Sequence, residues 1–383
     1  MQTSKNQKIR WAAWTCVAAA AALLSACGGG SSDGDVNRIT SVKVMGDSLA
    51  DSGTFGYKFT VQSAQPTGQG STALWTDQIA TQYGTSLCAH YRFSGGSFAP
   101  QAGCSNYAVG GGRINATAAA GSPLSIPQQL RDAAAQGYGK GDLVLLDGGG
   151  NDAADLVTSY LIAAVDQGAS LQQLLATKLD AATLQALLAI GPSALPEAGG
   201  LYMQALAKDW AANIRSQVLD QGAPRVAVLN VPDISLTPKL QLVLQQVTQQ
   251  QGEEAAQQLQ ALISGWVQTF NQQLAASLAG DSRVVIADFF AELNNQVRQP
   301  QKYGYTNVNN SACAPSGMDA QGLPSYDLAS CTAAGLSAHI PAGESAANWW
   351  QSYVFSDDFH PTPRGHAQLG KAVAASLAQA GWK

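Results

Sequence analysis

Four short runs of apolar residues recur along the chain, and each is nearly continuous rather than alternating with polar positions. The runs, rich in β-branched residues, are ITSVKVMG (39–46), DLVLLDGGG (142–150), RVAVLNVPD (225–233) and RVVIADFF (283–290). A shorter candidate is SNYAVGG (105–111). Continuous apolar runs are typical of strands that are covered on both faces of a parallel sheet. The pattern therefore predicts a buried parallel sheet.

Patterns typical of helices lie between these runs. They cover residues 201–218 and 240–278, and a last helix is expected near 363–380. Strands that alternate with helices are characteristic of layered α/β proteins. The fold class predicted from the pattern is therefore α/β.

Two stretches are longer than an ordinary connection between strands. Residues 154–220 carry two helical segments, and residues 239–279 are rich in Gln, Ala and Leu, with a predicted break at Gly252. Their leucines indicate core packing, and a lid over a site is the alternative. A third stretch, 301–356, has turn residues, two cysteines and little periodicity, which is typical of a functional or disordered loop. We interpret residues 39–383 as one domain with helical insertions.

The first 26 residues have the features of a secretory signal. A basic start is followed by the apolar stretch WAAWTCVAAAAALL, which is too short to span a membrane. The sequence LSAC, ending at Cys27, resembles a bacterial lipobox and implies cleavage before Cys27 and lipidation of its thiol. An ordinary signal peptide with a chance cysteine is the alternative.

Residues 27–38 form a polar tether, GGGSSDGD, directly after the cysteine. Gly28 at the position after Cys27 resembles lipoproteins that are sorted to the outer membrane. We therefore expect an exported protein that is anchored to a membrane by the lipid on Cys27. Anchoring in either leaflet, facing the periplasm or the cell surface, agrees with this sequence.

The charge of the chain argues against nucleic acid as a partner. Removing residues 1–26 takes away three basic residues and no acidic one, so the formal net charge falls from −5 to −8. No basic stripe remains that would bind a phosphate backbone.

Four cysteines remain after the tether, and outside the cytoplasm an even number predicts disulfides. Four cysteines allow three pairings. The pairs that close the shortest loops, and that we prefer, are Cys88–Cys104 and Cys313–Cys331. A metal cluster is less favoured because no Cys-x-x-Cys spacing occurs.

A serine stands where the first apolar run ends, in Gly-Asp-Ser-Leu. Gly, Asp and Ser are common turn residues, so an ordinary turn is one interpretation. The other is that Ser48 is a nucleophile at the carboxyl end of a strand, where open α/β sheets place their ligand sites.

The segment SDDFHPTPRGH (356–366) carries two of the four histidines, His360 and His366. Asp357 lies three positions before His360, and a helical turn would place both side chains on one face. Asp357 would then orient the imidazole while its other nitrogen takes a proton from Ser48. The alternatives are the first turn of the last helix and a metal site built from Asp357, Asp358, His360 and His366.

Two glycine-rich segments offer donors for an oxyanion. DGGGNDAAD presents the side-chain amide of Asn151, and NYAVGGG allows a close backbone approach. Each is also a plausible turn. The phosphate-loop, Gly-x-Ser-x-Gly and His-Glu-x-x-His motifs are absent from the sequence, which argues against nucleotide binding, α/β-hydrolases and zincins.

Together these pieces resemble the SGNH, or GDSL, hydrolase family, in the family's own order. GDSL with Ser48 resembles the first block, NYAVGGG the second, GGND with Asn151 the third, and DDFHP with Asp357 and His360 the last. The glycine of the second block lies five residues after its asparagine, which gives Gly111.

The resemblance implies a three-layer α/β/α, flavodoxin-like fold with a parallel five-stranded sheet. It implies Ser48 as nucleophile, His360 as base and Asp357 as the residue that orients the base. It also implies that the oxyanion is held by the backbone N–H groups of Ser48 and Gly111 and by the side chain of Asn151. No metal or organic cofactor is expected.

The chain is most similar to the secreted, lipolytic branch of that family. We therefore expect an esterase, lipase or lysophospholipase that hydrolyses carboxylic esters through an acyl-enzyme, with an ester or lipid as substrate. Trp349, Trp350, Tyr353 and Phe355 are candidates for the apolar wall of its pocket, and core packing is the alternative. The alternative functions are a carbohydrate O-deacetylase and a non-catalytic surface lipoprotein.

Overall fold

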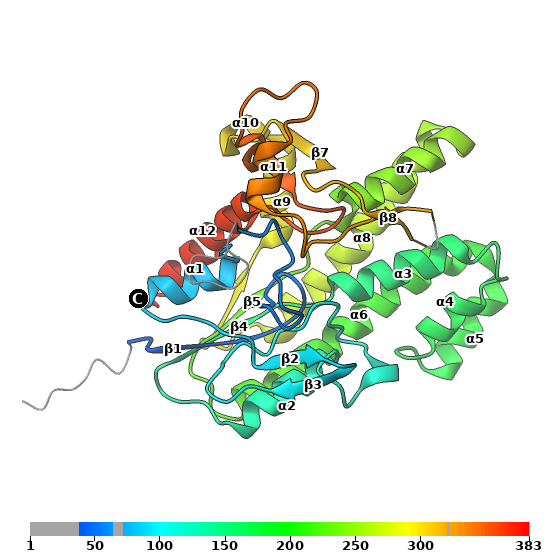
Figure 1. Cartoon of the computed structure of the whole chain (residues 1–383). Helices are drawn as coiled ribbons and strands as arrows, with labels where there is room; N and C mark the ends of the chain where they lie inside the picture. The colour runs from blue at the N-terminus through cyan, green and yellow to red at the C-terminus, as the bar shows by residue number, and fades with distance from the viewer. Residues whose placement is uncertain (1–37, 64–71, 320–321, 383) are drawn as a thin grey trace, which may run out of the picture. The chain divides into compact units, whose positions relative to one another are not determined.

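A parallel four-stranded sheet runs through the centre of the structure, with strand order β1-β4-β5-β6. Its strands are β1 (Ser41–Met45), β4 (Asp142–Leu146), β5 (Val226–Leu229) and β6 (Val284–Ala287). All three pairings are parallel. Each strand comes from one of the four apolar runs, so the sequence pattern located the sheet correctly (Figure 1).

The computed structural model describes residues 38–63, 72–319 and 322–382. The signal peptide expected at 1–26 and the lipidation expected at Cys27 lie outside the described residues, as does the tether up to Asn37. Among the helices of the described part, none has the length and hydropathy needed to cross a membrane.

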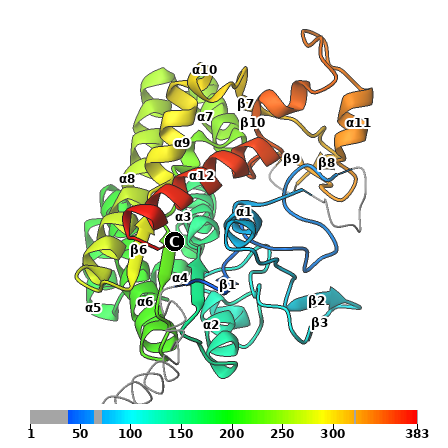
Figure 2. The ribbon, with the colours of Figure 1, turned by 90° about the vertical axis from the view of Figure 1, so that its left-hand side faces the viewer.

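Helices cover both faces of the sheet. One face carries α2 (Ile126–Ala135), α3 (Gly150–Ile162), α6 (Leu195–Ile214) and α8 (Glu253–Leu278), and the other carries α1 (Trp75–Gln82), α9 (Phe289–Arg298) and α12 (Pro363–Gln379) (Figure 2). Along β4, Val144 and Leu146 pack with the first set, whereas Leu143 and Leu145 pack with the second. This alternation follows the pleat of a strand. The three-layer α/β/α arrangement is confirmed.

The fifth strand implied by the family resemblance is not formed as a regular strand of this sheet in the described residues. The segment 105–109 lies alongside β1, where Tyr107 N–H donates to the Val44 carbonyl at 2.7 Å. The Asn106 side chain instead bonds to the loop after β1, donating to the Ala50 carbonyl at 2.7 Å. The pairing of this segment with β1 is an isolated bridge between Val44 and Asn106.

The insertions contain more helices than the sequence pattern indicated. Residues 154–220 hold the end of α3, then α4 (Ala169–Leu175), α5 (Ala181–Ile190) and α6, rather than two helical segments. Between β5 and β6, α7 (Pro238–Gln251) is separated from α8 at Gly252, whose φ of +92° favours glycine.

The remaining elements are short. Outside the central sheet the paired strands are β2 (Tyr91–Ser94) with β3 (Ser97–Pro100), β7 (Asn307–Ser311) with β10 (Tyr353–Phe355), and β8 (Gly317–Met318) with β9 (Pro324–Ser325). The short helices are α10 (Pro300–Tyr303) and α11 (Ala333–Ala338), and the single turns are η1 (Thr117–Ala119), η2 (Pro192–Ala194), η3 (Arg215–Leu219), η4 (Ile234–Leu236) and η5 (Trp349–Ser352). The structure contains both preferred disulfides, Cys88–Cys104 and Cys313–Cys331.

The packing of α6 on α8 gives a stability test with a built-in control. A Cβ added at Gly199 would collide with the indole of Trp266, whereas one added at the neighbouring Gly200 would meet nothing within 4 Å. Gly199→Ala should therefore lower the free energy of unfolding by about 1–3 kcal/mol through overpacking. Gly200→Ala should raise it by up to about 1 kcal/mol through helix propensity. Urea unfolding of the two variants measures both effects, and equal shifts would show that α6 does not pack as described.

Candidate active site

Three side chains from opposite ends of the chain form one hydrogen-bonded series. The Nε2 atom of His360 lies 2.8 Å from Oγ of Ser48, although the two residues are 312 positions apart. The other ring nitrogen, Nδ1, lies 2.7 Å from Oδ2 of Asp357. The structure thus brings together the three residues that the sequence analysis singled out as nucleophile, base and orienting acid.

The turn that holds His360 is closed by the Asp357 carboxylate. Its Oδ1 accepts hydrogen bonds from the backbone N–H groups of Phe359 at 2.8 Å and His360 at 2.6 Å. Ser356 N–H also donates to the His360 carbonyl at 2.7 Å. The expectation of a helical turn at this spacing was wrong. The turn is not helical, because the Asp357 carboxylate itself accepts the hydrogen bonds of the Phe359 and His360 backbone N–H groups. The last helix begins only at Pro363, after Thr362.

The charges in this turn oppose the effect of burial. Burial alone would raise the pKa of Asp357, but the imidazole of His360 and the two backbone N–H donors hold it below its ordinary value. Burial would lower the pKa of His360, but the charge of Asp357 and their hydrogen bond, with a contribution from Asp47, raise it. Asp357 therefore stabilises a proton on the imidazole ring.

The neighbouring acid has a different environment. Asp358 lies 3.6 Å from the Lys239 ammonium, and burial raises the pKa of Asp358 to about 6.

His366 is fully buried, and neither ring nitrogen has a hydrogen-bond partner within the described residues. Burial lowers the pKa of His366 to about 3. The four residues of the alternative metal site do not converge, since no cluster of three metal-ligating side chains occurs in the described ranges.

Three possible oxyanion donors lie at the same edge of the sheet. The backbone N–H groups of Ser48 and Gly111 donate to no group among the described residues. Asn151, in the first turn of α3, directs its side-chain amide to the Gly112 carbonyl at 3.0 Å. Gly111 has a φ of +78°, and Arg113 Nη1 donates to its carbonyl at 2.7 Å, which fixes this loop.

The family follows from a comparison with known protein families. The model of the GDSL-like lipase/acylhydrolase family matches residues 42–373. This chain belongs to the GDSL-like lipase/acylhydrolase family. The match spans the strands and loops that carry Ser48, Gly111, Asn151, Asp357 and His360. A comparison with curated proteins gives no match. Family membership supports a hydrolase that acts on acyl esters.

A buried pair of acids was missed by the sequence analysis. Asp147, directly after β4, accepts a hydrogen bond at Oδ1 from the Asp47 backbone N–H at 2.8 Å. A Cβ on Gly46 would occupy the place of that carboxylate oxygen. Burial, together with the charge of Asp47, raises the pKa of Asp147 well above its ordinary value in this GDSL-family protein. The available signal was an acidic residue close behind the apolar part of each of the first two runs, Asp47 after VMG and Asp147 after LVLL.

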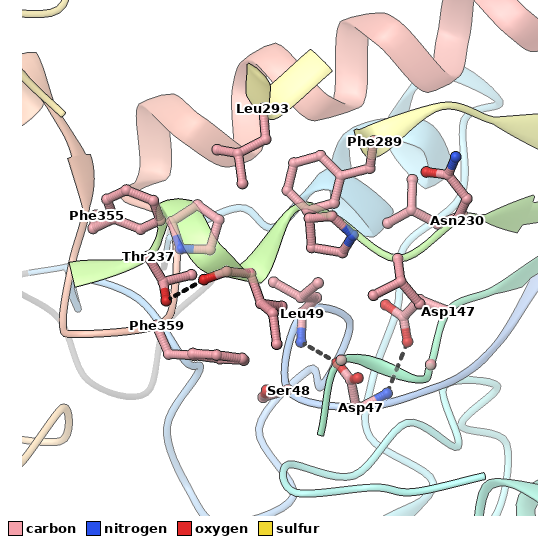
Figure 3. A pocket seen from close by; sticks show the side chains of 17 residues that line it. Asp47, Ser48, Leu49, Asp147, Asn230, Thr237, Phe289, Leu293, Phe355 and Phe359 are labelled. Atoms are coloured by element: carbon pink, nitrogen blue, oxygen red, sulfur yellow. Dashed lines mark hydrogen bonds between the residues drawn. The ribbon is translucent and has the colours of Figure 1, made fainter. Parts of the chain in front are cut away.

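An apolar cavity opens beside Ser48. Its volume is about 30 Å³, and Figure 3 shows Leu49, Phe289, Phe355 and Phe359 around it. Of the four aromatic residues expected to form the wall, only Phe355 lines this cavity. The other three, Trp349, Trp350 and Tyr353, belong to the cluster around the Cys313–Cys331 disulfide, as the core-packing alternative held.

Aromatic residues also approach the base from the loop after β1. The ring centroid of Phe59 lies 5.2 Å from that of His360. Phe59 in turn contacts Phe55, which packs against Phe93 and Phe98 of the β2–β3 hairpin. The sequence analysis gave these residues no role, because no periodic spacing connects them.

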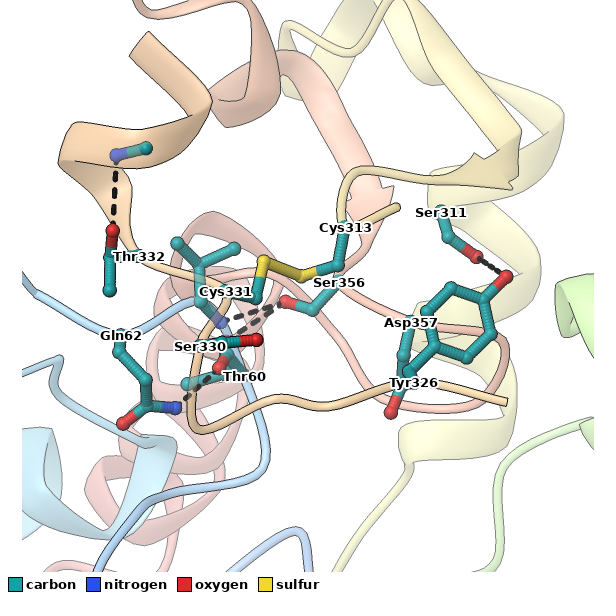
Figure 4. The surroundings of a disulfide bond; sticks show 12 residues. Thr60, Gln62, Ser311, Cys313, Tyr326, Ser330, Cys331, Thr332, Ser356 and Asp357 are labelled. Carbon is teal, nitrogen blue, oxygen red and sulfur yellow. Dashed lines mark hydrogen bonds between the residues drawn. A yellow bond between two sulfur atoms is a disulfide. The ribbon is translucent and has the colours of Figure 1, made fainter. Parts of the chain in front are cut away.

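The Cys313–Cys331 disulfide supports the turn that carries Asp357. Cys313 N–H donates to the Ser356 carbonyl at 2.7 Å, and Ser356 Oγ accepts from Val61 N–H at 3.1 Å (Figure 4). These bonds fix the residue directly before Asp357 from two sides. The disulfide bridges two points of the long loop 301–356, and the hydrogen bond from Cys313 connects that loop to the segment that carries Asp357 and His360.

The two adjacent acids give a test of this electrostatic arrangement. Asp357→Asn should lower the pKa of His360 toward the value that burial favours, because the main charge that raises it is removed. Asp358→Asn should lower it much less. An NMR titration of the imidazole in both variants measures the change. A larger decrease in the Asp358→Asn variant would mean that the wrong acid has been assigned to His360.

Proposed function

We propose that this protein hydrolyses carboxylic esters through an acyl-enzyme formed on Ser48, with no metal or organic cofactor. The observation that carries the proposal is the continuous series of contacts at 2.8 Å and 2.7 Å that joins Ser48, His360 and Asp357. A serine is activated as a nucleophile when a base lies within hydrogen-bond reach of it and a third group orients that base. Membership of an acylhydrolase family supports the same reaction class.

The first step is attack of Ser48 Oγ on the ester carbonyl carbon. The Oγ proton passes to Nε2 of His360, and Asp357 stabilises the imidazolium through Nδ1–H. The oxyanion is held by the Ser48 and Gly111 N–H groups and by the Asn151 amide. The imidazolium then protonates the leaving alcohol, and the acyl group remains on Ser48. Water, deprotonated by His360, attacks the acyl carbonyl carbon. The bond between that carbon and Ser48 Oγ then breaks, Oγ takes the proton back from the imidazolium, and the acid is released.

The cavity beside Ser48 favours an acyl group that is apolar and short. Aliphatic and aromatic side chains form most of its wall, beside the polar residues Asp47, Asp147, Asn230 and Thr237. Its volume of about 30 Å³ is far below the usual range for drug-sized ligands. The same small volume favours one alternative, a carbohydrate O-deacetylase, because an acetyl group is the shortest acyl group of that kind. A non-catalytic surface lipoprotein is the remaining alternative.

A panel of nitrophenyl esters distinguishes these functions. Turnover should be greatest for acetate and butyrate and should fall with longer acyl chains, because the cavity is small. Ser48→Ala should abolish turnover, and Asn151→Ala should lower kcat by about 10²–10³-fold, the usual effect of removing one oxyanion donor. Acetylated sugars used in parallel identify a deacetylase. Absence of turnover with every ester in a folded protein would contradict the proposal.

The pH dependence follows from the state of His360, which accepts a proton only as the neutral imidazole. Because Asp357 raises the pKa of His360 against the effect of burial, kcat/KM should rise with pH through a midpoint above the ordinary value of 6.5. The measurement is kcat/KM for a soluble ester across the stable pH range. A midpoint below 6.5 would show that Asp357 does not control this histidine.

We also propose that the protein is exported and anchored in the outer membrane through a lipid on Cys27. The support is the lipobox-like LSAC sequence, and the two disulfides are typical of an oxidising compartment. Cys27→Ser should abolish incorporation of labelled palmitate and move the protein from the membrane fraction to the soluble fraction. Palmitate incorporation that persists in this variant would exclude Cys27 as the lipidated residue.

A further inference from the structure

A second, larger cavity lies in the helical insertions. Its volume is about 940 Å³, and it is lined by residues from α3 to α8. Among the described residues, none lines both this cavity and the one beside Ser48. Helix α3 has Asn151 in its first turn, and Tyr160 and Leu161 near its other end line the second cavity. At a rise of 1.5 Å per residue, Asn151 and Leu161 lie roughly 15 Å apart along α3.

The lining of this cavity is apolar and carries no charge. Its leucines come from five different helices, and they include Leu161, Leu171, Leu184, Leu195, Leu259 and Leu262. Glutamines supply much of the polar lining, and no acidic or basic side chain takes part. The volume lies at the upper end of the range of small-molecule sites, which are also mostly apolar. A space of this kind suits a flexible hydrocarbon chain.

The surrounding sequence selects against an anionic ligand. The stretches that form the cavity, 159–176, 183–199 and 246–263, contain no Lys, Arg or His. They contain four acidic residues, and Asp166, Glu197 and Glu254 are each adjacent in sequence to a lining residue. A carboxylate or phosphate would find no basic side chain in these stretches to balance its charge. The ligand that fits is therefore uncharged.

Exposed apolar side chains mark the same region. Leu188 lines the cavity and is 45% exposed. Val165, next to the lining residue Ala164, is 85% exposed. Figure 1 shows α4 and α5 lying together beyond α3. An exposed leucine on the lining gives a hydrocarbon apolar surface to contact where it enters the cavity.

We propose that this cavity binds the alkyl chain of an uncharged amphiphile, such as a long-chain alcohol or a monoacylglycerol, at a site separate from Ser48. The chain would lie among the leucines of the insertion, and the hydroxyl head would bond to glutamine amides. This role is independent of the proposed ester hydrolysis. It gives the helical insertions a function other than that of a lid.

Calorimetric titration of the Ser48→Ala variant with hexanol, octanol and decanol tests the proposal without turnover. Each added methylene should tighten binding by about fourfold, because burying a CH₂ contributes about 0.8 kcal/mol. Decanoate should bind more weakly than decanol because of the acidic surroundings. No binding of any alcohol, or decanoate binding as tightly as decanol, would overturn the proposal.

Two exposed positions on α5 form a matched pair for locating the site. Leu188→Glu places a charge on the lining and should abolish decanol binding, whereas Ile190→Glu, at an exposed position off the lining, should retain it. Ala255→Trp, which fills the cavity from α8, should also abolish binding. Urea unfolding establishes that the variants are folded. Equal decanol binding in Leu188→Glu and Ile190→Glu would place the site elsewhere. The same substitutions in the protein with Ser48 intact should leave ester turnover unchanged.

Discussion

The hydrogen bond between Ser48 and His360 is the interaction on which the rest of this site depends. It joins the end of the first strand to the turn before the last helix, so nearly the whole domain must fold before it forms. The strand places Ser48 at the edge of the sheet, and the Asp357 carboxylate shapes the turn that presents the imidazole. That carboxylate has two uses, because one oxygen closes the backbone turn and the other faces Nδ1.

Close backbone packing at the ends of β1 and β4 is a second requirement. Gly46 leaves room for the Asp147 carboxylate, which in turn holds the backbone N–H of Asp47 beside Ser48. The glycines after Asp147 have φ values of +147° and +103° and lead directly into α3, which carries Asn151. The glycines therefore help to position Ser48 and Asn151, and they are not simple loop residues.

Much of this arrangement could be predicted from the sequence, for physical reasons that also explain the errors. The strands were found because a run covered on both faces is continuously apolar, and Ser48, Asn151 and His360 were found because they follow such runs or belong to family blocks. The role of Asp147 depends on the pairing of β1 with β4, which no local pattern encodes. The turn at Asp357 was expected to be helical because spacing alone does not reveal a carboxylate that bonds to its own backbone. Trp349 and Trp350 were ambiguous because an aromatic cluster has the same composition in a core and in a pocket wall.

The central claim is that Ser48 is a nucleophile activated by His360, and covalent labelling tests it most directly. The folded protein is treated with a fluorophosphonate, and the modified peptide is identified by mass spectrometry, alongside a His360→Ala variant. The account predicts one phosphonyl group on Ser48 and a large loss of labelling rate in the variant. Labelling of a different serine, or an equal rate in the variant, would contradict it.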